Sequence, residues 1–176
     1  MKLHLGCGEK HIEGYVNIDV RYLPGVDEVC NVMHLRQYET NSVDVIYASH
    51  VLEHFSRWDY MNVLNRWYNI LKPNGILRIC VPDFEIISKY YVETKKLRDI
   101  SGMLYGGQDY PENKHHWCWD FETLSHELKE LGFKNVYRYD WRLTEHSHID
   151  DFSQSYLPHK DKENGRLFSL NIEAIK

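Results

Sequence analysis

The sequence has no long apolar run, no apolar leader and no surplus of positive charge, and each absence excludes a class of protein. No apolar stretch approaches the roughly 18 residues that a membrane-spanning helix needs, and the N-terminus shows no signal-peptide core. Lys and Arg total 21 against 26 Asp and Glu, a formal net charge of −5. Because phosphate backbones attract basic surfaces, we expect no nucleic-acid partner.

Cysteine is scarce, and its four residues are widely spaced with no CxxC pair, at Cys7, Cys30, Cys80 and Cys118. This usage is typical of reduced, buried thiols, and without a leader it predicts a cytoplasmic protein. No repeat, low-complexity segment or linker interrupts the 176 residues. We therefore predict a single domain over residues 1–176.

Segments with strand patterns recur along the whole chain. They are Lys2–Leu5, Tyr15–Ile18, Glu28–Val32, Val43–Ala48, Ile76–Val81, Phe133–Tyr139 and Leu167–Ile175. Several are continuous apolar runs, typical of buried parallel strands. Helical patterns run from Ser56 to Leu71, from Phe84 to about Leu97 with Asp83 as its cap, and from the cap Asp120 to the stop Gly132. The sequence predicts an α/β fold whose last two strands pair antiparallel, because no helix lies between them. Short connections leave the first half with trimmed helices.

The first nineteen residues carry the most specific pattern. The strand Leu3–Leu5 runs directly into Gly6-Cys7-Gly8, and the strand-like piece Tyr15–Ile18 ends on Asp19. In α/β folds a glycine turn lets a ligand approach the backbone, and an acid at the end of the next strand accepts hydrogen bonds from ribose hydroxyls. The pattern therefore predicts a nucleoside pocket.

Four segments in this order resemble a class I S-adenosylmethionine-dependent methyltransferase, closest to the small type 11-like members. They are the strand–GxG–strand–acid unit, NSVDVIYASHVLEHF, LNRWYNILKPNGILRICVPDF and WDFETLSHELKELGF. The resemblance covers residues 2–83 well and continues through the last segment. It implies a Rossmann-like sheet of order 3-2-1-4-5-7-6 with strand 7 antiparallel. It also implies S-adenosyl-L-methionine as cofactor, lying across the carboxyl ends of strands 1 to 4.

The resemblance assigns nine residues to the cofactor: Gly6, Cys7, Gly8, Asp19, Asn31, Val32, Met33, Ser49 and His50. The glycine turn would approach the methionine and ribose portions and Asp19 the ribose hydroxyls. Asn31 would accept a hydrogen bond from the adenine amino group, and Val32 and Met33 would flank the ring. Ser49 and His50 would border the methionine end. His4 replaces the acid that usually helps anchor the methionine part. Because GCGEKH lacks GxGxxG, the turn offers no phosphate cradle, which argues against a dinucleotide enzyme.

Methyl transfer needs alignment of donor and acceptor, and an oxygen acceptor also needs a base. Histidine suits that role near neutral pH. The candidate catalytic residues are His50, His54, His115 and His116. The first two follow the fourth strand, at the ligand edge of an open α/β sheet, and the paired histidines stand in a tryptophan-rich loop. We expect a small polar acceptor, such as a sugar or a related metabolite.

The segment 144–165 between the last two strands is long and has no clear pattern of its own, which is typical of functional or disordered loops. It should emerge at the cofactor side, as a substrate lid, a subunit contact or a floppy excursion. The family's usual N-terminal covering helices are not expected here. The site would instead be closed by the segment after strand 5, by this loop or by a second subunit, as in a homodimer.

Three rival functions remain open at this stage. The first is a methyltransferase-like cofactor-binding protein without catalysis, suggested by His4. The second is a metal-dependent α/β enzyme that uses the histidine-rich loops. In an extended His146-x-His148-x-Asp150 segment these three side chains would share one face. The third is a nicotinamide-dependent Rossmann enzyme. We expect no resident metal.

Overall fold

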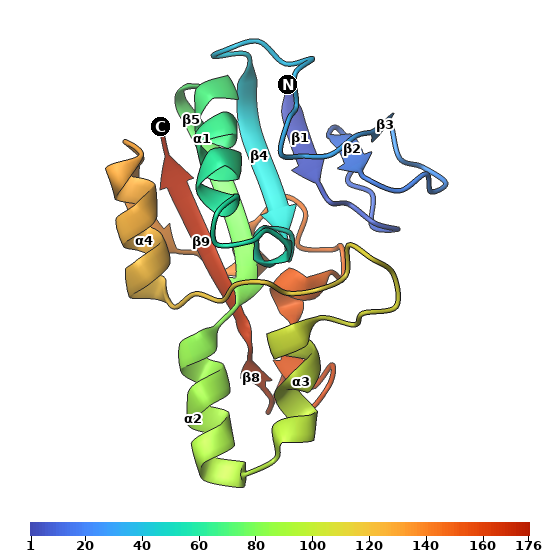
Figure 1. The fold of residues 1–176 in the computed structure, drawn as a ribbon, viewed down its shortest axis with the longest axis vertical. Coiled ribbons are helices and arrows are strands. Elements are labelled where there is room, and N and C mark those ends of the chain that lie inside the picture. The colour runs from blue at the N-terminus through green and yellow to red at the C-terminus, as the bar shows by residue number, and fades with distance from the viewer.

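The computed structural model describes residues 1–176 and places seven strands in one mixed sheet (Figure 1). They are β1 (Lys2–Leu5), β2 (Val16–Asp19), β3 (Glu28–Val29), β4 (Val43–Ser49), β5 (Leu71–Pro82), β6 (Lys134–Arg138) and β9 (Ser169–Ile175). Their order is β3-β2-β1-β4-β5-β9-β6. Strand β9 runs antiparallel to both of its neighbours, and the other pairs are parallel. The predicted α/β sheet order is confirmed, with β9 as its seventh strand.

The helices α1 (Tyr60–Ile70) and α4 (Phe121–Glu130) cover one face of the sheet, whereas α2 (Phe84–Thr94) and α3 (Leu97–Tyr105) lie beyond its carboxyl edge (Figure 1). The helix expected from about Phe84 to Leu97 is present as α2 but ends at Thr94, and a second helix that was not expected, α3, begins at Leu97. The chain breaks at Lys95, whose φ of +59° lies in the left-handed region that ends helices. The acids predicted as caps are confirmed, because Asp83 accepts from the Glu85 and Ile86 N–H groups and Asp120 from Thr123.

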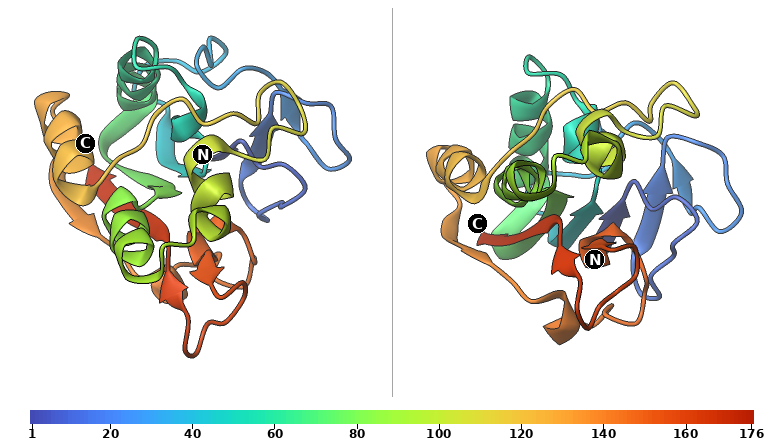
Figure 2. Two further views of the ribbon diagram at one scale, coloured as in Figure 1. Left: turned by 60° about the horizontal axis from the view of Figure 1, so that its bottom comes forward. Right: turned by 90° about the horizontal axis from the view of Figure 1, so that it is seen from below.

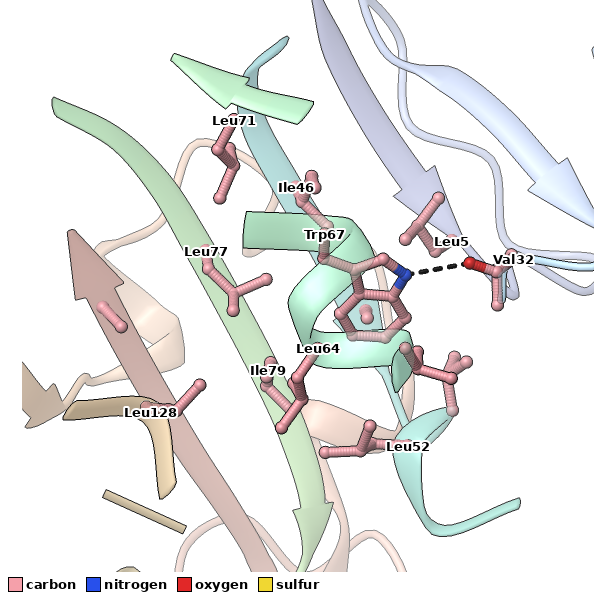
Figure 3. Close-up of a cluster of buried hydrophobic side chains, with 14 of the residues drawn as sticks. Leu5, Val32, Ile46, Leu52, Leu64, Trp67, Leu71, Leu77, Ile79 and Leu128 are labelled. Carbon is pink, nitrogen blue, oxygen red and sulfur yellow. Dashed lines mark hydrogen bonds between the residues drawn. The ribbon is translucent and has the colours of Figure 1, made fainter. Parts of the chain in front are cut away.

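Helix α1 anchors the core on its face of the sheet. Trp67 is fully buried among the apolar side chains of β1, β4 and β5 (Figure 3). Its indole Nε1–H donates to the Val32 carbonyl oxygen at 3.0 Å. A buried indole N–H needs such an acceptor. The bond therefore ties α1 to the chain that follows β3, next to the predicted adenine side of the pocket.

The opposite face of the sheet is covered by the chain after β6 and not by α-helices (Figure 2). This chain contains the short helices η2 (Trp141–Leu143) and η3 (Phe152–Gln154) and the hairpin of β7 (Tyr156–Leu157) with β8 (Arg166–Leu167). Within the loop predicted over 144–165, the regular elements are η3 and β7, and turns and bends make up most of the rest. Its periodicity is weak because these elements are two or three residues long and take their order from contacts with the sheet.

Glu145 provides the main polar contact between this covering segment and the sheet. Its carboxylate accepts from Arg78 on β5 at 2.7 Å, from the Tyr15 hydroxyl at 2.6 Å and from Lys2 on β1 at 3.2 Å. Farther along, Asp151 accepts from the Tyr47 hydroxyl of β4 at 2.6 Å. The covering segment thus packs against the sheet of the same chain.

No helix in the fold combines the length and apolar character that crossing a bilayer would require. In this arrangement the carboxyl ends of β1, β2 and β4 point toward α3 and the loop that follows it (Figure 1).

Candidate active site

The glycine turn after β1 has the backbone that the sequence predicts. Gly6 and Gly8 have φ values of +63° and +53°, a region that favours glycine. A Cβ on Gly6 would overlap the Val51 side chain, so only glycine fits there. The buried Cys7 holds the turn against β2, because its main-chain N–H donates to the Ile18 carbonyl oxygen at 3.0 Å.

Asp19 ends β2 beside this turn, and only 4% of its surface is exposed. Its Oδ2 accepts the Gly8 N–H at 2.8 Å. Its Oδ1 accepts the main-chain N–H of Arg21 at 2.9 Å and the Arg21 Nε–H at 3.2 Å. The predicted neighbourhood of turn and acid is therefore formed, and the carboxylate is fixed in orientation.

Arg21 also contacts the loop that follows α3, which the sequence analysis did not anticipate. Its guanidinium carbon lies 4.2 Å from the centre of the Tyr110 ring, a cation–π contact. Arg21 Nη2 lies 3.5 Å from where a Cβ on Gly8 would be. Arg21 and Tyr110 together form a pair, the Arg21–Tyr110 clamp, that lies over the glycine turn. An arginine two residues after the acid was the only sequence signal.

The predicted adenine-side residues lie in a turn. The strand expected to reach Val32 ends at Val29, because the exposed Asn31 folds its side chain back on the chain. Its Oδ1 accepts the Met33 N–H at 2.9 Å. Val32 is buried, Met33 is half-buried, and a shallow pocket lined partly by Cys30 and Asn31 opens beside them.

At the end of β4, Ser49 and His50 lie where the sequence predicts. Ser49 is buried, and its Oγ has no hydrogen-bond partner. His50 has a φ of +54°, uncommon for a residue with a side chain, and such strain concentrates at functional sites. Its Nε2 lies 3.2 Å from Ser169 Oγ, and its Nδ1 lies 3.1 Å from Glu53 Oε1.

Glu53 in the short helix η1 (Leu52–His54) is the centre of a histidine cluster. It is fully buried, and neither carboxylate oxygen has a well-aligned hydrogen bond. Burial by itself would raise the pKa of Glu53, but the neighbouring histidines, His50 first among them, outweigh it and hold the pKa below its usual value. His115 also contacts this group, with Nε2 at 3.9 Å from Glu53 Oε1, and burial lowers the pKa of its imidazole.

The four histidines predicted as catalytic thus separate into two groups. His50, His54 and His115 gather around Glu53, whereas His116 is exposed and only its main-chain N–H reaches the Glu53 carbonyl oxygen, at 2.8 Å. Glu53 was missed as a site residue because a glutamate after a strand is usually a capping group. Its complete burial is visible only in the folded chain.

The alternative His146-x-His148-x-Asp150 metal face is not formed. His146 is buried against the Tyr47 ring, with centroids 4.1 Å apart, whereas His148 is exposed. Asp150 is exposed too and pairs with Lys162 at 2.8 Å. The segment turns instead of extending, because Ser147 and Ile149 donate back to Thr144 and His146, and the alternating faces of a strand do not apply.

His4, which stands where an acid is expected, has a packing role. It is 2% exposed, stacks on Tyr47 with centroids 5.2 Å apart, and its Nδ1 lies 3.1 Å from Asn17 Oδ1. Burial lowers its pKa to about 4, against the opposing hydrogen bond to Asn17. The ring thus packs between neighbouring strands of the sheet, where burial disfavours its charged form.

Comparison with known proteins gives one family and many similar folds. The sequence profile of the family described as "Methyltransferase domain" matches residues 5–138, more than half of the chain. No curated protein matches the sequence. Among solved structures, an S-adenosylmethionine-dependent methyltransferase from Methanosarcina mazei has a TM-score of 0.63 at 17% identity, covering 99% of this chain and 91% of that one.

Two further structures have the same fold. A methyltransferase from Archaeoglobus fulgidus has a TM-score of 0.60 at 17% identity, with 99% of this chain and 85% of that chain covered. The 1,6-didemethyltoxoflavin-N1-methyltransferase of Burkholderia thailandensis, solved with bound 1,6-didemethyltoxoflavin and S-adenosylhomocysteine, has a TM-score of 0.59 at 17% identity, with 99% of this chain and 70% of that chain covered. The chain therefore belongs to the methyltransferase-domain family, and its fold is that of S-adenosylmethionine-dependent methyltransferases, as its sequence predicts.

Proposed function

We propose that the protein methylates a small polar acceptor, of the class of a sugar or a related metabolite, and that His50 is its general base. The observation that carries this proposal is the placement of His50 at the carboxyl end of β4. Its Nδ1 lies 3.1 Å from the buried Glu53 carboxylate, and its Nε2 lies 3.2 Å from Ser169 Oγ. A carboxylate behind an imidazole orients the ring and stabilises the charge that follows proton uptake.

The residues around the glycine turn fit S-adenosylmethionine. Gly6 and Gly8 keep the backbone accessible in a conformation closed to larger residues, and the Asp19 carboxylate is held at the end of β2. The Ser49 Oγ is buried without a partner and can donate to a ligand. These residues would hold the ribose and methionine portions, with Cys7 between the glycines. The Asn31–Met33 turn would flank the adenine.

The bound cofactor supplies a methyl group already activated on a sulfonium sulfur. The protein's own residues then align the acceptor and exclude water. In the present arrangement Ser169 Oγ donates to Asn171 and faces His50 Nε2 at 3.2 Å. The acceptor's hydroxyl would take the place of Ser169 at Nε2, and His50 would accept its proton there as the methyl group leaves the sulfur for the acceptor oxygen, while Glu53 balances the positive imidazole. The polar cluster of His50, Glu53 and Ser169 at this edge supports a polar acceptor.

The experiment measures S-adenosylhomocysteine formation with a panel of sugars, sugar derivatives and cell-extract fractions. We expect turnover with at least one small polar acceptor. His50→Gln should lower kcat by about 100-fold or more, the usual contribution of a general base. His126→Gln, an exposed histidine on α4, is the matched control and should leave kcat unchanged. Cofactor binding without turnover in every fraction would instead favour the non-catalytic alternative.

A further inference from the structure

We propose that Glu53, His54 and His115 form a binding site for one divalent transition-metal ion of the zinc class. Each of the three offers a ligand atom, and these atoms lie within 4.8 Å of one another. Two imidazoles with one carboxylate are a ligand set that zinc and related ions use in proteins. The proposal departs from the expectation of no metal.

Glu53 supplies the strongest indication that a ligand belongs here. Its side chain has no exposed surface, and neither Oε1 nor Oε2 makes a hydrogen bond. His50 Nδ1 comes within 3.1 Å of Oε1 but without the alignment of a hydrogen bond. A buried carboxylate that accepts no well-aligned hydrogen bond is costly, and ion-paired or metal-bound carboxylates are the usual buried ones. A cation would satisfy the carboxylate oxygens.

Both histidines are oriented as metal ligands usually are. The Nδ1 of His115 is 2.8 Å from the Met103 carbonyl oxygen, and the Nδ1 of His54 is 3.1 Å from the Lys114 carbonyl oxygen. A carbonyl accepts only from a protonated nitrogen, so each contact places the proton on Nδ1 and leaves Nε2 with a free lone pair. This backbone support is typical of the groups behind metal-bound histidines.

The three residues come from two segments that the backbone holds together. Glu53 and His54 belong to η1, and His115 to the loop between α3 and α4, which passes beside η1 (Figure 1). The His116 N–H donates to the Glu53 carbonyl oxygen at 2.8 Å, and the rings of His54 and His115 lie edge to face with centroids 4.9 Å apart. The site is thus preformed in the fold.

Three protein ligands leave at least one coordination position for water or a ligand oxygen. An ion here would lie beside His50, because Glu53 would bind the ion and also lies 3.1 Å from His50 Nδ1. The metal site is inferred from the contacts of Glu53, His54 and His115 alone. A role of the ion as a Lewis acid toward the acceptor would in addition require the proposed function. For this reason the test measures the metal alone, with neither cofactor nor acceptor.

The experiment titrates Zn²⁺ into full-length, chelator-stripped protein by calorimetry, and follows Co²⁺ binding by its visible absorption. All variants carry Cys118→Ser, because this exposed thiol is another zinc ligand. We expect one ion per chain with a Kd on the order of 1 μM or below. His54→Gln and His115→Gln should each weaken binding at least tenfold. The adjacent His116→Gln should stay within about twofold of the parent protein.

Circular dichroism and thermal unfolding of each variant confirm that it is folded. The test replaces the histidines and not the fully buried Glu53, because a substitution at the half-buried His54 is better tolerated by the fold. The proposal is overturned if the parent protein binds Zn²⁺ no more tightly than the His54→Gln/His115→Gln double variant does. It is also overturned by an equal loss in His116→Gln, which would show adventitious surface binding only.

Discussion

Arg21 and Asp19 form a part-buried ion pair directly over the glycine turn, with Nε donating to Oδ1 at 3.2 Å. Asp19 is the acid proposed to bind the cofactor ribose, and its other oxygen already accepts the Gly8 N–H. The carboxylate therefore both shapes the turn and offers its remaining lone pairs to a ligand. Two predictions follow from this pair and from the Tyr110 ring that Arg21 contacts.

Replacing Asp19 by Ala should weaken S-adenosylmethionine binding by about 10- to 100-fold. Hydrogen bonds to a charged group contribute about 1.5–3 kcal/mol each. Calorimetry with the cofactor measures the change. Glu13→Ala, an exposed acid in the same region, is the matched control and should bind normally. Equal affinities of wild type and Asp19→Ala would exclude the acid from the cofactor site, and thermal unfolding separates loss of binding from loss of fold.

Replacing Tyr110 by Ala should loosen the Arg21–Tyr110 clamp and raise the rate at which the cofactor dissociates by roughly fivefold. A partly exposed cation–π contact contributes on the order of 1 kcal/mol. Tyr110→Phe keeps the ring over Arg21 and should dissociate at the wild-type rate. Stopped-flow fluorescence measures both. A faster rate in Tyr110→Phe as well would assign the effect to the hydroxyl group, against the clamp.

His4 should make folding stability depend on pH between about 4 and 6.5. Burial lowers the pKa of folded His4 to about 4, whereas the unfolded value is 6.5. As pH falls, the unfolded chain takes up the proton first. The stabilisation is therefore fully present above pH 6.5, declines as pH falls toward 4, and amounts to about 3 kcal/mol at most.

Urea unfolding at several pH values tests this prediction. The free energy of unfolding of wild type should fall more steeply than that of His4→Gln between pH 6.5 and 4.5. The difference in slope is the readout, because the substitution also changes packing against Tyr47 and the contact with Asn17. His146 and Asp151, which lie nearby, remain in both proteins. Parallel curves would show that His4 does not titrate differently in the folded state.

Replacing Trp67 by Phe should destabilise the fold by roughly 1–3 kcal/mol, because the buried Val32 carbonyl loses its donor. Trp67→Ala should cost about 3–5 kcal/mol by adding a cavity. Trp58→Phe, at a residue 76% exposed, should stay within about 0.5 kcal/mol of wild type. Urea unfolding measures the three variants. Faster hydrogen exchange of the Met33 amide in Trp67→Phe would locate the loosening at the adenine-side turn; an unchanged rate there would contradict the proposed tie.

The sequence alone determined the sheet and its glycine turn, because both depend on patterns within a few residues of each other. Apolar runs marked the strands, Asp83 and Asp120 marked two helix starts, and the Gly6–Gly8 turn followed by Asp19 marked the pocket. Each of these signals is local, so neighbouring residues were sufficient to predict it.

Tertiary structure decided what depends on contacts between distant residues. Glu53 and His115 are 62 positions apart, and their approach depends on how the loop after α3 crosses η1. The covering segment around Glu145 has no periodicity of its own and is ordered by the sheet face beneath it. His4, at the position of the expected acid, is buried against Tyr47, which lies 43 positions along the chain on a neighbouring strand. Burial and long-range contact are properties of the folded chain, and local patterns carry little information about them.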